Sequence, residues 1–136
     1  MGKERTEKSV RRAIVLDAGG LIAFERASEG VAALIEHAAK VQAAVLIPAS
    51  ALAQVWRGGP RSARLAQLVA NAESDPLDEA RAKEVGKRLG DRAKTDIADA
   101  HVVCCALAQN AAVVTSDRDD IEALAQSTEK LVLVSI

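Results

Sequence analysis

Residues 13–20, with the sequence Ala-Ile-Val-Leu-Asp-Ala-Gly-Gly, decide the fold of this chain. A short apolar run bounded by turn residues is typical of a strand that is buried on both faces. Residues 14–16 form such a run, and Gly19 and Gly20 mark the turn that follows it. We therefore expect Asp17 at the carboxyl end of a central strand, which is where open α/β sheets bind their ligands.

Strand and helix patterns alternate along the rest of the chain. A short helix or turn is expected over residues 18–26, and strands over residues 43–47, 111–114 and 131–134, with a short strand at Pro76-Leu77. Helices are expected over residues 28–40, 50–57, 61–71, 79–89, 96–109 and 119–126, with a loop at residues 91–94 and with Ser28, Ser50 and Thr95 as N-caps. This alternation predicts an α/β fold, a three-layer sandwich around a central, mainly parallel sheet.

The length and composition fit one folded domain. The chain has 136 residues, of which 49% are hydrophobic and 27% charged, as is usual for soluble globular proteins. We predict a flexible polar leader over residues 1–11 and a single domain over residues 12–136. The first ten residues are too polar for a signal peptide, and no apolar run approaches the roughly 18 residues of a membrane span. We therefore expect a cytoplasmic protein without a membrane partner.

Charge and aromatic content exclude some modes of binding. The formal net charge is −1, so attraction to a nucleic acid must come from local patches. The chain has one Trp, one Phe and no Tyr, which argues against binding single strands by base stacking. Its two cysteines, Cys104 and Cys105, are adjacent in an apolar stretch, so neither a disulfide framework nor a zinc cluster is expected.

Four aspartates are candidates for a common site. Asp17 and Asp117 each follow a predicted strand, while Asp96 and Asp99 share one face at the start of the helix predicted over residues 96–109. Each one alone fits an ordinary helix cap or turn. If the two strands are parallel neighbours, however, the carboxylates gather at one edge of the sheet, and their mutual repulsion favours a bound cation.

The type of ligand indicates which cation would bind. A site made only of oxygen atoms suits Mg²⁺ or Mn²⁺. Such ions can activate water and stabilise charge during an attack on phosphate. His37 and His101 belong to no evident metal motif, so we interpret His37 as a surface residue and His101 as a packing or surface residue.

Four short motifs occur in a fixed order along residues 13–135. They are Leu16-Asp17-Ala18, Pro-Ala-Ser-Ala-Leu-Ala-Gln-Val-Trp at residues 48–56, Asp-Ala-His-Val-Val at residues 99–103, and Val-Thr-Ser-Asp at residues 114–117. In this order and spacing the chain resembles the PIN-domain family. It is especially similar to the VapC-type ribonuclease toxins of type II toxin–antitoxin pairs.

The resemblance implies a PIN-like fold and a metal-dependent endoribonuclease. Asp17, Asp99 and Asp117 match the acidic positions with which the family binds Mg²⁺ or Mn²⁺ and cleaves RNA, and Asp96 would be an additional ligand on the same face. The resemblance also implies an RNA substrate, a small antitoxin protein as partner, and a homodimer.

Two positions depart from the family's pattern. Gln54 stands where the family usually has Glu; its amide can coordinate a metal through the carbonyl oxygen but brings no negative charge. Gly19 stands where the family often has Ser or Thr, so one hydroxyl contact is expected to be missing. The alternative function is therefore a PIN-fold module that binds RNA or protein with weak or no catalysis.

Basic residues near the motifs could contact an RNA backbone, which gives affinity without sequence preference. They are Arg57, Arg61, Arg64, Arg88, Arg92 and Lys94. Trp56 is expected in the core or at an interface. Other classes of enzyme fit less well: a dehalogenase-like phosphatase needs a second Asp where Gly19 stands, and the sequence has neither a P-loop nor a GxSxG motif.

Overall fold

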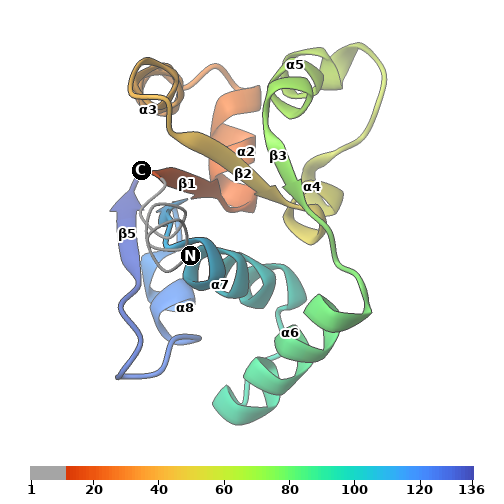
Figure 1. Ribbon diagram of the computed structural model, residues 1–136. Helices are drawn as coiled ribbons and strands as arrows, with labels where there is room; N and C mark the ends of the chain where they lie inside the picture. Colours follow the sequence, from red (N-terminus) through yellow and green to blue (C-terminus); the bar gives the residue numbers. More distant parts are fainter. Residues whose placement is uncertain (1–11) are drawn as a thin grey trace, which may run out of the picture.

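A computed structural model of the chain describes residues 12–136 (Figure 1). The predicted polar leader, residues 1–11, lies outside the described residues. Among the helices that the structure describes, none is both long and apolar enough to cross a membrane.

Five strands form one sheet in the order β3-β2-β1-β4-β5. The strands are β1 (Ala13–Leu16), β2 (Ala44–Pro48), β3 (Glu73–Asp75), β4 (Ala112–Thr115) and β5 (Val132–Ser135). Every neighbouring pair is parallel, so the prediction of a mainly parallel sheet is confirmed. The carboxyl ends of the central strands β1 and β4 consequently lie at the same edge of the sheet.

Helices flank the sheet, as predicted for a three-layer α/β sandwich (Figure 1). They are α2 (Ala18–Glu25), α3 (Glu29–Lys40), α4 (Ala49–Val55), α5 (Ala63–Asn71), α6 (Glu79–Arg92), α7 (Ile97–Gln109) and α8 (Arg118–Glu122), with a short 3₁₀ turn, η1 (Pro60–Ser62). Helix α7 packs on β1, β2 and β4, and α6 packs on α7. Helix α2 follows β1 directly and contacts both β1 and β4.

The centre of the core is formed by β1 and α7. Val15 and Leu16 of β1 are completely buried, and residues 100–106 of α7 are all buried. This explains why the sequence of α7 is apolar all round, since a helix enclosed by other elements has no polar face. Cys104 and Cys105 lie in this core as free thiols, and burial raises the pKa of Cys105.

Several predicted boundaries were wrong. The short strand is Glu73–Asp75 instead of Pro76-Leu77, because the edge strand β3 is selected by backbone pairing with β2 and not by apolar side chains. Helix α6 continues into the loop predicted over residues 91–94 and ends at Arg92. An ion pair between Lys87 and Asp91, one helical turn apart, supports this last turn.

Two predicted N-caps were also wrong. Helix α7 is capped by Asp96 and not by Thr95. Helix α4 begins at Ala49, so Ser50 lies inside its first turn. Trp56, which follows α4, is 41% exposed and does not belong to the core.

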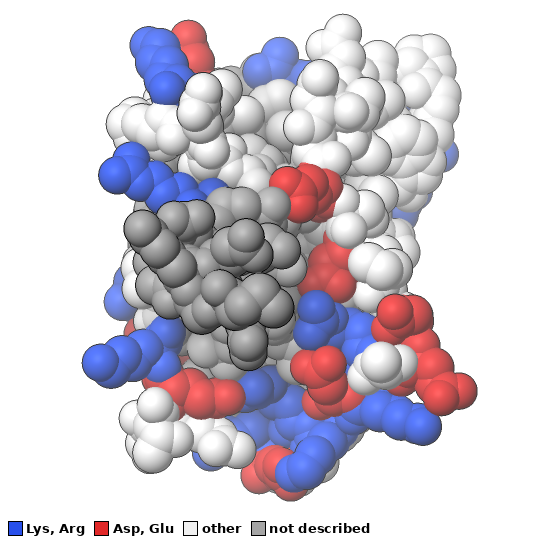
Figure 2. All heavy atoms as spheres, in the orientation of Figure 1, with Lys and Arg blue, Asp and Glu red and all other residues white. Residues whose placement is uncertain are grey.

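Charged side chains are unevenly spread on the face seen in Figure 2. They gather on its lower part, where α6 lies in Figure 1, whereas the upper right part, where α5 lies, is largely uncharged. Within α6 the opposite charges pair, as in the ion pairs of Lys83 with Glu79 and of Arg81 with Glu84. The basic residues of this region are therefore largely balanced by neighbouring carboxylates.

Candidate metal centre

Asp17 ends β1 and caps α2. Its Oδ1 accepts a hydrogen bond of 2.7 Å from the backbone N–H of Gly20, and only 3% of the residue is exposed. Burial raises the pKa of Asp17, and hydrogen bonds from the Thr115 hydroxyl and the backbone of Gly20 and Gly19 partly offset this. The first predicted site residue is thus also part of the structure of the β1–α2 turn.

Thr115 connects two of the predicted aspartates. Its hydroxyl donates to the carboxylate of Asp17 and accepts a hydrogen bond of 2.8 Å from the backbone N–H of Asp117. Thr115 is fully buried at the end of β4, which is the parallel neighbour of β1. The ends of β1 and β4 therefore lie together, as predicted, and the Thr115 hydroxyl bonds to the residues that follow both strands.

Asp99 lies in the first turn of α7. Its backbone N–H donates to Oδ1 of Asp96, the N-cap of the helix. Partial burial raises the pKa of Asp99 to about 6, and repulsion from Asp96, Asp17, Asp117 and Asp120 adds to this effect. Asp96 is therefore a helix cap whose charge acts on Asp99.

Three carboxylates come close enough to share an ion. Oxygen atoms of Asp99, Asp117 and Asp120 all lie within 4.8 Å of one another. Asp120 was not predicted as a site residue, although its spacing of three residues from Asp117 could have revealed it. Its carboxyl forms a hydrogen bond with that of Asp117, and this interaction is the largest of those that raise the pKa of Asp117.

Asp17 lies outside this group of three, but it acts on the group electrostatically. Its charge contributes to the raised pKa of both Asp99 and Asp117. Mutual repulsion among carboxylates is relieved when a cation neutralises them, and oxygen ligands of this kind suit Mg²⁺ or Mn²⁺. The residues present thus fit a divalent ion.

Two hollows meet beside the acidic cluster. The first, of about 150 Å³, is lined by Lys94, Thr95, Asp96, Asp99, Asp120 and Leu124. The second, of about 430 Å³, is lined by Ser50, Gln54, Thr95, Asp96, Ile97 and Ala98. They share Thr95 and Asp96 as lining residues. Gln54 is exposed and lines the second hollow.

The side chain of Ser116 takes the place of a side chain on residue 19. Its Oγ lies 2.0 Å from the position that a β-carbon on Gly19 would occupy, and Oδ1 of Asp17 lies 3.3 Å from that position. The hydroxyl expected to be missing at Gly19 is therefore replaced in space by that of Ser116. Sequence position alone could not reveal this exchange, because it joins the ends of two strands.

His101 is buried at the centre of a polar network. Its Nδ1 forms a hydrogen bond with the Ser50 hydroxyl, and its Nε2 lies 3.5 Å from Oδ1 of Asp75. The packing role expected for His101 fits its complete burial, and burial lowers its pKa. Its hydrogen bond to Ser50 was not foreseen, because the two residues are 51 positions apart.

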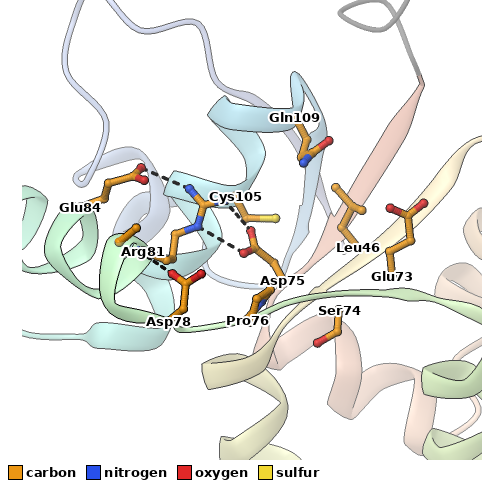
Figure 3. A pocket seen from close by; sticks show the side chains of 11 residues that line it. Leu46, Glu73, Ser74, Asp75, Pro76, Asp78, Arg81, Glu84, Cys105 and Gln109 are labelled. Atoms are coloured by element: carbon orange, nitrogen blue, oxygen red, sulfur yellow. Dashed lines mark hydrogen bonds and ion pairs between the residues drawn. The ribbon is translucent and has the colours of Figure 1, made fainter.

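A separate polar pocket of about 340 Å³ lies between β3 and α6 (Figure 3). Arg81 donates to both carboxylate oxygens of Asp75, at 3.2 and 3.0 Å, and also bonds Glu84. Although burial opposes ionisation, the Cys105 thiol and Arg81 keep the pKa of Asp75 below its usual value. These contacts tie the edge strand to α6, and none of the clustered aspartates lines this pocket.

Several basic residues predicted for RNA binding have structural partners. Arg88 forms two hydrogen bonds with the Glu129 carboxylate, at 2.7 and 2.9 Å, and this pairing lowers the pKa of Glu129 to about 2. The Arg64 guanidinium lies over the Phe24 ring, and its Nε donates to the backbone carbonyl oxygen of Phe24. Arg57 donates to the backbone carbonyls of Trp56 and Gln54.

Comparison with models of protein families gives a match to the PIN domain. The model of the PIN domain matches residues 14–126. A comparison with curated proteins gives no match.

Solved structures with a similar fold include VapBC2 from Rickettsia felis, bound to a DNA fragment from the promoter. That match has a TM-score of 0.66 and 16% identity, and it covers 91% of this chain and 98% of the other. A second similar structure is FitAB bound to a DNA fragment called IR36. Its TM-score is 0.60 with 16% identity, over 90% of this chain and 94% of the other.

Proposed function

Because this chain belongs to the PIN-domain family, we propose that it is a divalent-metal-dependent endoribonuclease. The observation that carries the proposal is the group of oxygen atoms from Asp99, Asp117 and Asp120, all within 4.8 Å of one another. The ion would be Mg²⁺ or Mn²⁺, since every ligand is a carboxylate oxygen.

Each aspartate has a distinct part in this proposal. Asp99, Asp117 and Asp120 would hold the ion, while the buried Asp17 adds negative charge behind them and fixes Thr115. Asp96 orients the first turn of α7 through its bond to the Asp99 amide. When bound, the divalent ion lowers the pKa of water and offsets charge on the phosphate. With a pKa of about 6, Asp99 holds a proton below that pH when no ion is bound.

The proposed biological role is that of a toxin that is restrained by a small antitoxin. Support comes from the fold, which is similar to that of VapBC2 and FitAB. We also propose a homodimer, because an apolar hollow of about 380 Å³ is open at the surface, lined by Ala49, Leu52, Ala53, Trp56 and Val69.

A second candidate function is a PIN-fold module that binds RNA or protein without efficient cleavage. The observation that favours it is Gln54, an uncharged residue at a position where the family usually has an acid. Replacing Gln54→Glu separates the two candidates. A large gain in cleavage would indicate a site weakened by the missing charge, whereas a small change would indicate that the amide is accommodated.

The main experiment measures cleavage of a mixed RNA pool by the purified protein with Mn²⁺, Mg²⁺ or EDTA. Asp99→Asn tests the site, and Asp91→Asn is the matched control, because Asp91 is an exposed aspartate on α6. We expect metal-dependent cleavage in the wild type and the control, and its loss in Asp99→Asn. Folded protein that cleaves nothing with either metal would contradict the nuclease proposal and favour the binding module.

A further inference from the structure

The second hollow is lined mainly by uncharged residues, some of which can form hydrogen bonds. Next to the acidic hollow, Gln54 and Ser50 lie one turn apart on α4 and face the first turn of α7 across about 430 Å³. Asp96 is the one charged residue among the six that line this hollow, and it stands at the border shared with the acidic hollow. A nucleotide whose phosphate lies at the aspartates could therefore extend its uncharged part into this space.

Ser50 is hydrogen-bonded to the buried ring of His101. Nε2 of His101 lies 3.5 Å from Oδ1 of Asp75, so a ring proton at Nε2 would face a carboxylate. In that tautomer Nδ1 accepts from the Ser50 hydroxyl. The Ser50 oxygen can then only accept a further hydrogen bond.

Gln54 and Ile97 complete the chemistry of the hollow. The exposed Gln54 amide offers both a donor and an acceptor, whereas a glutamate would offer acceptors only. Ile97 is 53% exposed and supplies apolar surface at the start of α7. Arg57 donates to the backbone carbonyl of Gln54, so this bond does not use the side-chain amide. An apolar surface with an adjacent donor and acceptor matches the face and edge of a nucleobase.

We propose that this hollow is a nucleobase subsite in which Gln54 reads the base edge and thereby sets the cleavage sequence. This inference rests on the proposed nuclease function. A glutamine amide pairs with adenine through N6 and N7, whereas a carboxylate accepts from N4 of cytosine. Adenine is therefore the expected base, and the amide at position 54 is a specificity-determining group, not a defective metal ligand.

The first test maps cleavage positions in a randomised RNA with Mn²⁺. The wild type is expected to enrich adenine at one fixed distance from the cut. Gln54→Ala should reduce that enrichment about tenfold, and Gln54→Glu should shift it towards cytosine. Gln67→Glu is the matched control, since Gln67 is an exposed glutamine on α5, and it should keep the wild-type profile. Thermal unfolding of each variant checks that it is folded.

Identical sequence profiles in the wild type and both Gln54 variants would overturn the proposal. A faster Gln54→Glu enzyme with an unchanged profile would overturn it too, because the residue would then act only at the metal.

A second test separates this inference from the nuclease proposal. Fluorescence anisotropy measures binding of labelled oligoadenylate, oligocytidylate and oligouridylate with Ca²⁺ in place of Mn²⁺, so that a cation neutralises the aspartates while the readout is binding and not cleavage. A preference of the wild type for oligoadenylate that Gln54→Glu moves to oligocytidylate supports the subsite even if the protein cleaves no RNA. Equal binding of the three oligonucleotides by the wild type and by Gln54→Glu would overturn the subsite, whatever the cleavage assay shows.

Discussion

The Oγ of Ser116 lies 2.0 Å from the point where a β-carbon on residue 19 would stand. Ser116 follows β4 and Gly19 lies in the first turn of α2, so two segments almost one hundred residues apart share one side-chain position. The Ser116 hydroxyl can therefore occupy its position only because Gly19 has no side chain.

This contact predicts a coupling between the two positions. In the wild-type background Gly19→Ala should destabilise the protein by about 1 kcal/mol, because the Ser116 side chain must move. In a Ser116→Gly background the same change should stabilise it by about 0.5–1 kcal/mol, as expected for alanine replacing glycine in a helix. Urea unfolding of the four proteins in the cycle measures the coupling. An equal effect of Gly19→Ala in both backgrounds would show that the contact carries no energy.

Asp17 caps α2 and also contributes negative charge to the acidic cluster, and two substitutions separate these roles. Asp17→Asn keeps an oxygen that accepts from the Gly20 amide, so stability should change by less than about 0.5 kcal/mol. Asp17→Ala removes this cap and should cost about 1–2 kcal/mol. Both variants should lose Mn²⁺-dependent cleavage. Chemical unfolding and the RNA assay check the two parts, and equal stabilities of the two variants would refute the capping role.

Asp99 predicts how stability depends on pH without metal. Its folded-state pKa of about 6 lies above the ordinary value of 3.8, so the folded protein holds this proton more tightly than the unfolded chain does. The resulting stabilisation is complete below the ordinary value and is lost as the pH rises through about 6. Asp99→Asn should therefore be near neutral at about pH 4 and stabilising by about 1 kcal/mol at about pH 7, allowing for solvent screening.

Urea unfolding across this pH range, in EDTA, measures the effect of Asp99. Asp91→Asn on α6 serves as the control and should give no such pH-dependent gain. Adding Mn²⁺ should then stabilise the wild type more than Asp99→Asn, because the ion replaces the proton. A gain from Asp99→Asn that is the same at every pH would contradict the assigned repulsion.

The hydrogen bond between Ser50 and the buried His101 should contribute to the free energy of unfolding. Ser50→Ala removes the hydrogen bond to the buried Nδ1 and should destabilise the protein by about 1–3 kcal/mol. Replacing both partners, with Ser50→Ala and His101→Leu, should recover part of that loss, because neither group of this bond is then left buried without its partner. Thermal and urea unfolding measure the cycle, with Ser74→Ala on the exposed edge strand as control. A neutral Ser50→Ala would remove the basis for a fixed Ser50 hydroxyl.

Left-handed backbone positions offer stabilising changes. Ala27 and Ala93 have φ values of 60° and 53°. These values lie in the left-handed region, which is less favourable in free energy for alanine than for glycine. Ala27→Gly and Ala93→Gly should each stabilise the protein by about 0.5 kcal/mol after the entropy of the unfolded chain is counted. Ala82→Gly inside α6 is the control and should cost about 1 kcal/mol. Destabilisation by both of the first two changes would contradict the backbone assignment.

The sequence predicted those features that depend on apolar runs. The strand before Asp17, its parallel neighbour before Asp117 and the buried helix that carries Asp99 were all located within a residue or two, because each is a continuous hydrophobic segment. The edge strand was misplaced, since Glu73 and Ser74 pair through their backbone and carry no apolar signal.

The finer chemistry of the candidate site could not be predicted, because it depends on contacts between distant segments. Thr115 belongs to the Val-Thr-Ser-Asp motif, but the bond from its hydroxyl to Asp17 forms only when β1 and β4 pair. Asp120 lies in the helix predicted over residues 119–126, and its approach to Asp99 arises only when α7 and α8 pack together. Ser50 and His101 likewise meet only in the folded chain.

The exposed Trp56 can serve as an intrinsic fluorescence probe of this protein. The chain has one tryptophan and no tyrosine, so its intrinsic fluorescence arises almost entirely from one indole, two residues beyond Gln54. With 41% of that residue open to solvent, emission responds to whatever covers the end of α4, and the unmodified protein can be followed. The proposed binding of RNA beside Gln54 and of a second copy on the apolar hollow can thus be tested without a label. A molecule that binds only near Arg81 should leave the signal unchanged.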